Sequence, residues 1–330
     1  MRGGALACVL VAAAAWIPPE RAAARCVRTV IAVPILSTDG AVVVPVEVDG
    51  VAAAAEIAPR DTMGVVIDTG GLRFQSDGSV RIGELDGDTV GSRTRIRRLQ
   101  LGDAVAEDVP AVMTGRVRLP EVAGRRIMLQ IGADILDAYQ VLMDLPGRRL
   151  TLFTDEGTGC PDPVRAAAGH AVPLREGAAG QLDRVDAVLD GHALSMEINL
   201  SANDSVVGLA EAERFGAPDA VLAADPKVRT GLARALVGRR HRFASLRVAG
   251  YEVADGRVDV QPGVAYDVLG LDFFQNRVTL FDFPGRRMVV GEIGRTGSAV
   301  PDPPRASMLS TVRTRSAEAT AAEEPAPPHR

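Results

Sequence analysis

The sequence is poor in cysteine and histidine and has no excess of positive charge. It contains three cysteines and four histidines in 330 residues, and its formal net charge is -5. A nucleic-acid-binding protein would need a basic face, so we expect no nucleic-acid partner. The histidines lack ligand spacing, so we expect no metal and no cofactor. They are His170, His192, His241 and His329.

Long apolar runs are also missing. The longest apolar run near the N-terminus, Ala5 to Ile17, has about 13 residues, whereas a membrane-spanning helix needs about 20. Arg2 precedes this run, and prolines and small residues follow it, which is the layout of a signal peptide over residues 1–24. We therefore expect a periplasmic or secreted monomer that does not associate with a membrane after signal removal.

One segment of the chain occurs twice. Residues 131–153 (IGADILDAYQVLMDLPGRRLTLF) return as residues 269–291 (LGLDFFQNRVTLFDFPGRRMVVG), with identities that include Gly132 with Gly270 and Asp134 with Asp272. Upstream, two alternating apolar stretches turn at Asp49-Gly50 and at Asp190-Gly191, as β-hairpins do. A repeat of this length indicates two similar lobes rather than a solenoid.

Apolar residues alternate with a period of two in most of both copies, which predicts a mainly β protein. One helix is expected at residues 208–215, before Gly216, and tight turns of type II at Pro146-Gly147 and Pro284-Gly285. We predict a first lobe at 25–155, a linker at 156–172, a second lobe at 173–294 and a disordered tail at 295–330.

Two cysteines, Cys26 and Cys160, remain after signal removal. In an exported protein this pair favours a disulfide, which would tie together the two ends of the first lobe. Free, buried thiols are the alternative.

These features together resemble the retropepsin-like and pepsin-like aspartic proteases. The shared features are a hairpin, a short strand ending in a motif of the Asp-Thr-Gly type, paired strands, and a hydrophobic-Gly-x-Asp motif before a final hairpin. The closing segments resemble those of exported bacterial members. The resemblance implies two β-barrel lobes whose facing aspartates share a proton and activate a water molecule.

The resemblance places the two catalytic positions eight residues after each hairpin glycine, at Ala58 and at Asn199. Neither residue can serve as a general base. On this register Ser201 and Ala202 are expected to line a cleft. The implied function is a non-cleaving protein that binds an extended peptide or a partner segment in the groove between the lobes.

A rival register uses Asp68-Thr69-Gly70, which follows an apolar strand and matches the catalytic motif by itself. It lies 18 residues after Gly50 instead of eight, and its partner in the second lobe would still be Asn199, with Asp204 five residues further on. The alternative function is thus an active aspartic endopeptidase that uses Asp68. A third hypothesis is a structural envelope protein that acts through its tail, Pro301 to Arg330.

Overall fold

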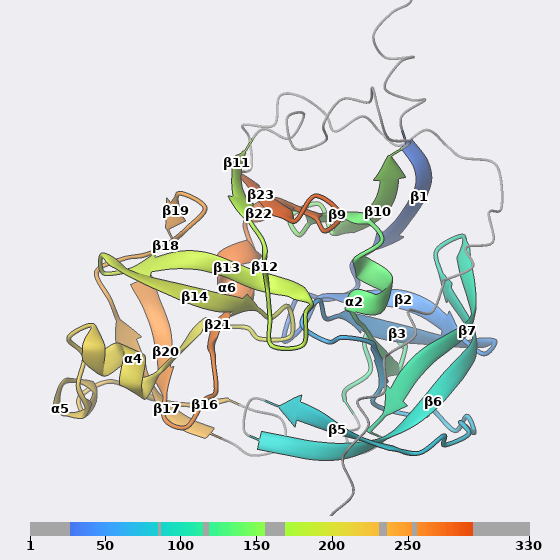
Figure 1. Cartoon of the computed structure of the whole chain (residues 1–330), viewed down its shortest axis with the longest axis horizontal. Helices are drawn as coiled ribbons and strands as arrows, with labels where there is room; N and C mark the ends of the chain where they lie inside the picture. The colour runs from blue at the N-terminus through green and yellow to red at the C-terminus, as the bar shows by residue number, and fades with distance from the viewer. Residues whose placement is uncertain are drawn as a thin grey trace, which may run out of the picture.

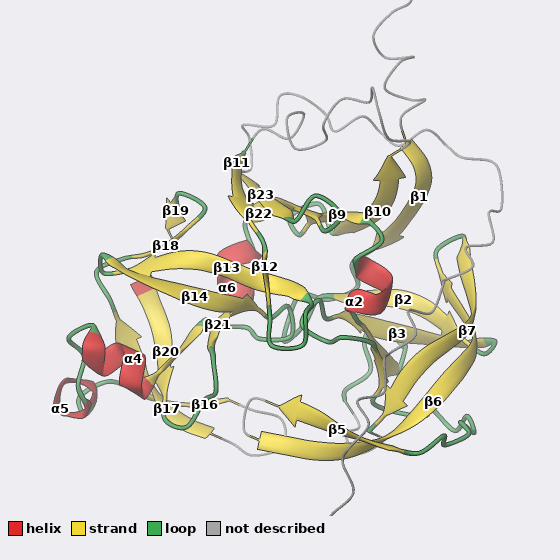
Figure 2. Ribbon diagram, in the orientation of Figure 1, coloured by secondary structure: helices red, strands yellow, loops and turns green. Residues whose placement is uncertain are grey.

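The computed structural model describes residues 27–84, 87–114, 119–155, 169–230, 236–252 and 256–292. Most of these residues lie in strands, which form three sheets, and the few helices are short (Figure 2). The signal peptide, Cys26, Cys160, most of the linker and the tail lie outside the described residues. The predictions for these segments therefore stay predictions.

The first lobe is built on a seven-stranded sheet with the order β2-β3-β8-β4-β7-β6-β5. An additional pairing of β2 with β6 closes six of these strands into a barrel. The strands are β2 (Val43–Val48), β3 (Val51–Ile57), β4 (Gly64–Val66), β5 (Ser79–Glu84), β6 (Gly87–Leu101), β7 (Ala104–Met113) and β8 (Ile127–Ile131).

The second lobe contains a ten-stranded sheet in which β16-β17-β20-β15-β21-β14-β13-β18-β19 follow one another and β12 pairs with β13. Its strands are β12 (Arg175–Glu176), β13 (Leu182–Leu189), β14 (His192–Ile198), β15 (Val206–Gly208), β16 (Lys227–Thr230), β17 (Leu236–Arg242), β18 (Leu246–Val248), β19 (Tyr251–Glu252), β20 (Arg257–Gln261) and β21 (Asp267–Leu269). The predicted helix is confirmed as α4 (Leu209–Arg214), which ends before Gly216 at φ 90°, and α5 (Asp219–Leu222) follows it.

A third sheet draws three strands from each half of the chain and lies above both lobes in Figure 1. Its order is β1-β10-β9-β22-β23-β11, and Leu142 of β9 pairs directly with Leu280 of β22. These two leucines are equivalent in the sequence repeat, so the pseudo-twofold axis passes between them. The strands are β1 (Val27–Pro34), β9 (Gln140–Asp144), β10 (Arg149–Asp155), β11 (His170–Pro173), β22 (Arg277–Asp282) and β23 (Arg287–Glu292).

The two lobes repeat the same strand connections. In the first, β8 lies between β3, to which it is parallel, and β4, to which it is antiparallel, while β4 is parallel to β7. In the second, β21 lies in the same way between β14 and β15, and β15 is parallel to β20. The predicted mainly β fold with two similar barrel-like lobes is therefore confirmed. One buried apolar cluster runs through both lobes and the shared sheet.

The hairpin turns at Asp49-Gly50 and Asp190-Gly191 are confirmed, since all four residues have positive φ, as a type I′ turn requires. The type II prediction for the closing turns is wrong. The positive φ falls on Arg148 and Arg286 and not on the preceding glycines. Glycine is needed at 147 because the Asp144 carboxylate, which accepts a hydrogen bond from the Gly147 N–H at 2.8 Å, occupies the place of a Cβ.

Two short helices follow the Gly-x-Asp motifs, α2 (Ala133–Leu136) and α6 (Leu271–Phe274). A Cβ on Gly132 would lie 2.6 Å from the carbonyl oxygens of Asp61 and Met63, and one on Gly270 would lie 2.6 Å from the Asp204 carbonyl group. The motif glycine is thus required for the close approach of each motif to the loop after β3 or β14. Asp272 accepts a hydrogen bond from the Ser205 hydroxyl at 2.8 Å, a structural role.

Candidate functional site

The loops that follow β3 and β14 have the same backbone hydrogen bonds. The Ala58 N–H donates to the Ile131 carbonyl at 3.0 Å, and the Asn199 N–H donates to the Leu269 carbonyl at 3.0 Å. One turn later, the N–H groups of Asp61 and Ala202 donate to the carbonyls of Ala58 and Asn199. Ala58 and Asn199 therefore occupy equivalent positions in the two lobes.

The two loops meet where the lobes contact each other, and we call this region, which comprises residues 56–61 and 197–203 with the residues that touch them, the seam. The Val42 N–H donates to the Leu200 carbonyl at 2.9 Å, and the Gly40 N–H donates to Asn203 Oδ1 at 2.7 Å. Both hydrogen bonds join one lobe to the other. The strand register of the lobes thus brings the two equivalent loops together.

At the two equivalent positions the side chains are an apolar methyl group and an amide. Ala58 is buried, and Asn199 is 8% exposed. Asn199 Oδ1 accepts a hydrogen bond from the Ser201 N–H at 2.9 Å, which fixes the amide in place. The Ser201 hydroxyl, predicted to line a cleft, donates to Glu56 Oε2 at 3.1 Å instead of standing free, and the Ala202 carbonyl accepts from the Leu271 N–H.

Two pairs of equivalent residues cross the seam. Glu56 and Glu197 each stand two residues before the equivalent loop positions, and Arg60 and Ser201 each stand two residues after them. Ser201 of the second lobe contacts Glu56 of the first, while Arg60 Nε of the first lobe lies 3.4 Å from Glu197 Oε1 of the second. The pseudo-twofold axis thus relates a hydrogen bond between a hydroxyl and a carboxyl group to an ion pair between a guanidinium and a carboxyl group.

Carboxyl groups outnumber cations around Arg60. Asp61 Oδ1 lies 3.7 Å from Arg60 Nε, and the guanidinium of Arg184 lies 3.8 Å from Glu197 Oε2. The Tyr266 ring lies about 6 Å from the guanidinium carbons of both arginines, at 5.9 Å for Arg60 and 6.0 Å for Arg184. Glu56 also accepts a hydrogen bond from Gln130 Nε2 at 2.9 Å.

Burial raises the pKa of several of these carboxyl groups, because the charged form loses hydration. The pKa of Glu197 rises to about 7 and that of Asp61 to about 6, although the charge of Arg60 opposes both shifts. Desolvation also raises the pKa of Asp183, although a hydrogen bond from Gln181 Nε2 opposes the shift. Within the described part of the chain, Asp183 Oδ1 and Glu197 Oε1 are buried without a hydrogen-bond partner.

The rival motif Asp68-Thr69-Gly70 lies elsewhere, just beyond the end of β4. Asp68 Oδ1 accepts a hydrogen bond from the Gly70 N–H at 2.9 Å, and the Asp68 N–H points to the Met128 carbonyl at 3.4 Å. Val65 of β4 pairs with Gln130, and Val206 of β15 pairs with the equivalent residue Val268, so Asp68 is equivalent to Leu209, the first residue of α4. Asp204, its possible partner by sequence, binds Arg240 at 2.5 Å.

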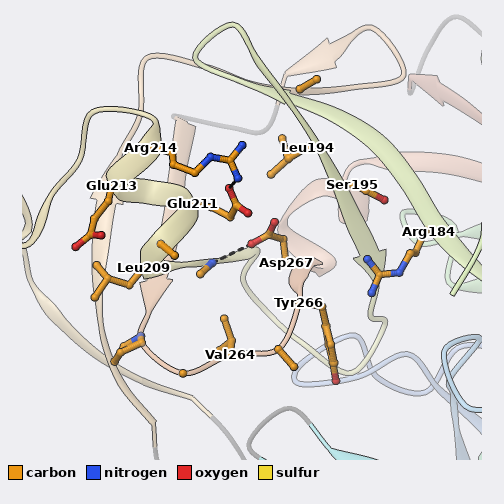
Figure 3. Close-up of a pocket in the computed structure, with 16 residues that line it drawn as sticks. Arg184, Leu194, Ser195, Leu209, Glu211, Glu213, Arg214, Val264, Tyr266 and Asp267 are labelled. Carbon is orange, nitrogen blue, oxygen red and sulfur yellow. Dashed lines mark hydrogen bonds and ion pairs between the residues drawn. The ribbon is translucent and has the colours of Figure 1, made fainter. Parts of the chain in front are cut away.

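A pocket of about 670 Å³ opens beside the seam on the second lobe (Figure 3). Arg184 and Tyr266 lie on the side of the pocket opposite α4, and Leu194 and Val264 contribute apolar surface. Near α4, Arg214 is paired with Glu211 at 2.5 Å, and Asp267 accepts the Gly208 N–H at 2.9 Å. The pocket therefore shares Arg184 and Tyr266 with the seam.

The described ranges contain neither a metal-binding cluster nor a candidate membrane span. No group of three or more His, Cys, Asp or Glu side chains among those residues is arranged to hold a metal ion. No helix among them is long and apolar enough to cross a membrane.

The structure of an aspartic proteinase from Irpex lacteus is similar to 82% of this chain and 99% of its own, with 12% identity and a TM-score of 0.49. Basic 7S globulin from soybean is similar over 82% of this chain and 96% of its own, with 11% identity and a TM-score of 0.49. No protein-family model and no curated protein sequence matches the chain. The two-lobed β architecture is established by the strand pairings of the chain itself.

Sequence reasoning missed Glu56, Arg60 and Glu197. A signal for the two glutamates was present, because they are 141 residues apart, the same offset that separates the two hairpin turns (197 - 56 = 141 and 191 - 50 = 141). Charged residues are uncommon within apolar strands, because such strands are usually buried. A glutamate at the same place in both copies therefore indicates a polar contact at that position. Their partners depend on how the lobes are arranged, which the repeat alone does not specify.

Proposed function

We propose that this protein is an exported, non-cleaving relative of the aspartic proteases that binds an extended peptide or a partner segment between its lobes. The observation that carries the proposal is the equivalence of Ala58 and Asn199. In the proteases that the sequence resembles, these two positions hold the pair of carboxyl groups that activates water. A methyl group and a hydrogen-bonded amide leave that pair without either acid.

The carboxyl groups that remain near the seam do not replace the missing pair. Glu56 is bonded to Ser201 and Gln130, and Glu197 and Asp61 both lie against Arg60. A general base must reach the water that it activates, and these groups are instead directed at protein partners. Their arrangement supports a role in holding the lobes together rather than in hydrolysis.

Binding of an extended segment needs backbone groups that can accept another strand. β5 is an edge strand of the first-lobe sheet and β16 is one of the edge strands of the second-lobe sheet, and both lie at the lower side of the molecule in Figure 1. An edge strand presents unpaired N–H and C=O groups, so an added strand gains main-chain hydrogen bonds there. Side-chain contacts near the seam would then determine which segment binds.

The test is a cleavage assay and a binding assay on the same protein. We expect no cleavage of an unfolded protein or of a mixed peptide library between pH 3 and pH 7, and saturable binding of some library members, measured by fluorescence anisotropy. Pepstatin-sensitive cleavage at acidic pH would overturn the proposal. The absence of both cleavage and binding would also contradict it, since it requires a ligand.

The second candidate is an active aspartic endopeptidase that uses Asp68. It is favoured by the intact Asp-Thr-Gly motif and by the buried Asp68 Oδ2, which has no hydrogen-bond partner in the described part of the chain. The equivalence of Asp68 to Leu209 argues against it, because two acids must face each other. Asp68→Asn decides between the candidates: it must abolish any cleavage if Asp68 is catalytic, and must leave peptide binding unchanged if it is not.

A further inference from the structure

We propose that the seam acts as a proton-operated latch between the two lobes. The latch holds the lobes together most firmly while its buried carboxyl groups carry protons, and it loosens as these groups ionise. This inference concerns the free protein and is independent of the proposed ligand.

Acidic groups outnumber basic groups at the seam. Glu197 faces Arg60 and Asp61 from the loop after β3, and Asp183 and Arg184 from β13, with Tyr266 from the loop before β21. Asp61 in turn faces Glu56 of β3 and Asp183. The negative charge of Asp183 also raises the pKa of Asp137, which follows α2. Glu56, Asp61, Asp183 and Glu197 are thus four carboxyl groups beside two guanidinium groups. Full ionisation would leave an excess of negative charge in a buried place, which is costly.

Two of these carboxyl groups are buried and incompletely bonded. Asp183 is fully buried, and its Oδ1 has no hydrogen-bond partner in the described chain. Glu197 is 6% exposed, and its Oε1 has an ion-pair contact with Arg60 Nε at 3.4 Å but no hydrogen bond among the described residues. A buried, unpaired charge is far more costly than a buried neutral carboxyl group. A protonated carboxyl group also gains a hydrogen-bond donor, which these oxygens lack when ionised.

The acidic groups lie on both sides of the seam. Glu56 and Asp61 belong to the first lobe, and Asp183 and Glu197 belong to the second. Ionisation therefore adds like charge to both lobes where they meet. Arg60 attracts Glu197 and Asp183 across the seam. As the acids ionise, the repulsion between carboxylates on opposite sides of the seam opposes these attractions.

The pKa directions place the transition near neutral pH. Burial raises the pKa of Glu197 to about 7 and the pKa of Asp61 to about 6. The closed seam therefore binds protons more tightly than the separated lobes, where these groups are hydrated. Proton loss between about pH 5 and pH 8 then favours loosening.

The test uses two backbone amides of the full chain. The Val42 N–H donates across the seam to Leu200, whereas the Ile57 N–H donates within the first lobe to Val42. We expect the hydrogen-exchange protection factor of Val42 to fall at least tenfold more than that of Ile57 from pH 5 to pH 8, because opening of the seam exposes Val42 in addition to the global unfolding that exposes both amides. Because protection factors are corrected for intrinsic exchange, pH alone does not produce this difference.

Three variants complete the test. Glu197→Gln keeps the residue neutral at all pH values, so it should remove most of the pH dependence at Val42. Arg60→Met removes the charge that favours ionised Glu197, so it should move the midpoint upward by about one pH unit. Glu121→Gln, an exposed control, should behave as the parent.

Either of two results would overturn the latch. One is parallel behaviour of Val42 and Ile57 in the parent protein. The other is that Arg60→Met leaves the midpoint of the pH dependence at Val42 unchanged. This variant provides the test even if Glu197→Gln does not fold.

Discussion

Arg60 Nε of the first lobe lies 3.4 Å from Glu197 Oε1 of the second, at the place where the two equivalent loops meet. The pseudo-twofold mate of this contact is the hydrogen bond from Ser201 to Glu56. The two lobes therefore use the same two backbone positions to contact each other, with different chemistry on each side of the axis.

Arg60→Ala should destabilise the protein. It leaves Glu197 buried without its nearest cation, and removing one partner of a buried ion pair costs about 3–5 kcal/mol. Proton uptake by Glu197 relieves part of this cost, so we expect a larger loss of unfolding free energy at pH 8 than at pH 5. Urea unfolding measures both values. Arg175→Ala, which breaks the exposed pair with Asp186, is the control and should cost no more than about 1 kcal/mol.

The unfolding free energy should decrease as the pH rises from about 4.5 to about 7. The pKa of Glu197 is raised from 4.5 to about 7 in the folded protein, so in this window the folded state binds more protons than the unfolded state. The contribution of this residue is on the order of 3 kcal/mol, and Asp61 adds in the same direction. Urea titrations across this range provide the measurement, and a stability that increases toward pH 7 would contradict the assignment of these groups.

Asn199→Asp should not produce cleavage. The new carboxylate would keep the hydrogen bond from the Ser201 N–H, but Ala58 offers no acid to share its proton. The assay is hydrolysis of an unfolded protein at acidic pH. Ala58→Asp is the matched variant on the other side of the axis, and cleavage by either single variant would show that a carboxyl group elsewhere at the seam completes the pair.

Gly132→Ala should destabilise the first lobe. Its Cβ would lie 2.6 Å from two backbone oxygens, of Asp61 and Met63, which no rotamer change can move. Overpacking of this kind costs about 1–3 kcal/mol, measurable by thermal or urea unfolding. Gly208→Ala is the control, since the nearest atom to its Cβ would be at 3.5 Å, an ordinary contact.

Local signals in the sequence were sufficient for the β class, the two lobes, the helix before Gly216 and the hairpin turns at Asp49-Gly50 and Asp190-Gly191. These features follow from apolar periodicity, from the repeat and from residues that tolerate positive φ. The closing turns were predicted with the wrong type, because Gly147 is required by the position of the Asp144 carboxylate and not by its own φ. The residue preferences of the turn types contain no information about a side-chain contact of this kind.

The sequence by itself determined that the chain is duplicated and which residues of one copy correspond to those of the other, because both depend on local order along the chain. Only the tertiary structure decided that Arg60 reaches Glu197 and Ser201 reaches Glu56. These contacts join residues that are 137 and 145 positions apart (197 - 60 = 137 and 201 - 56 = 145). They form because two barrels pack about an axis between Leu142 and Leu280, and that axis is fixed by a pairing of distant strands rather than by any local pattern.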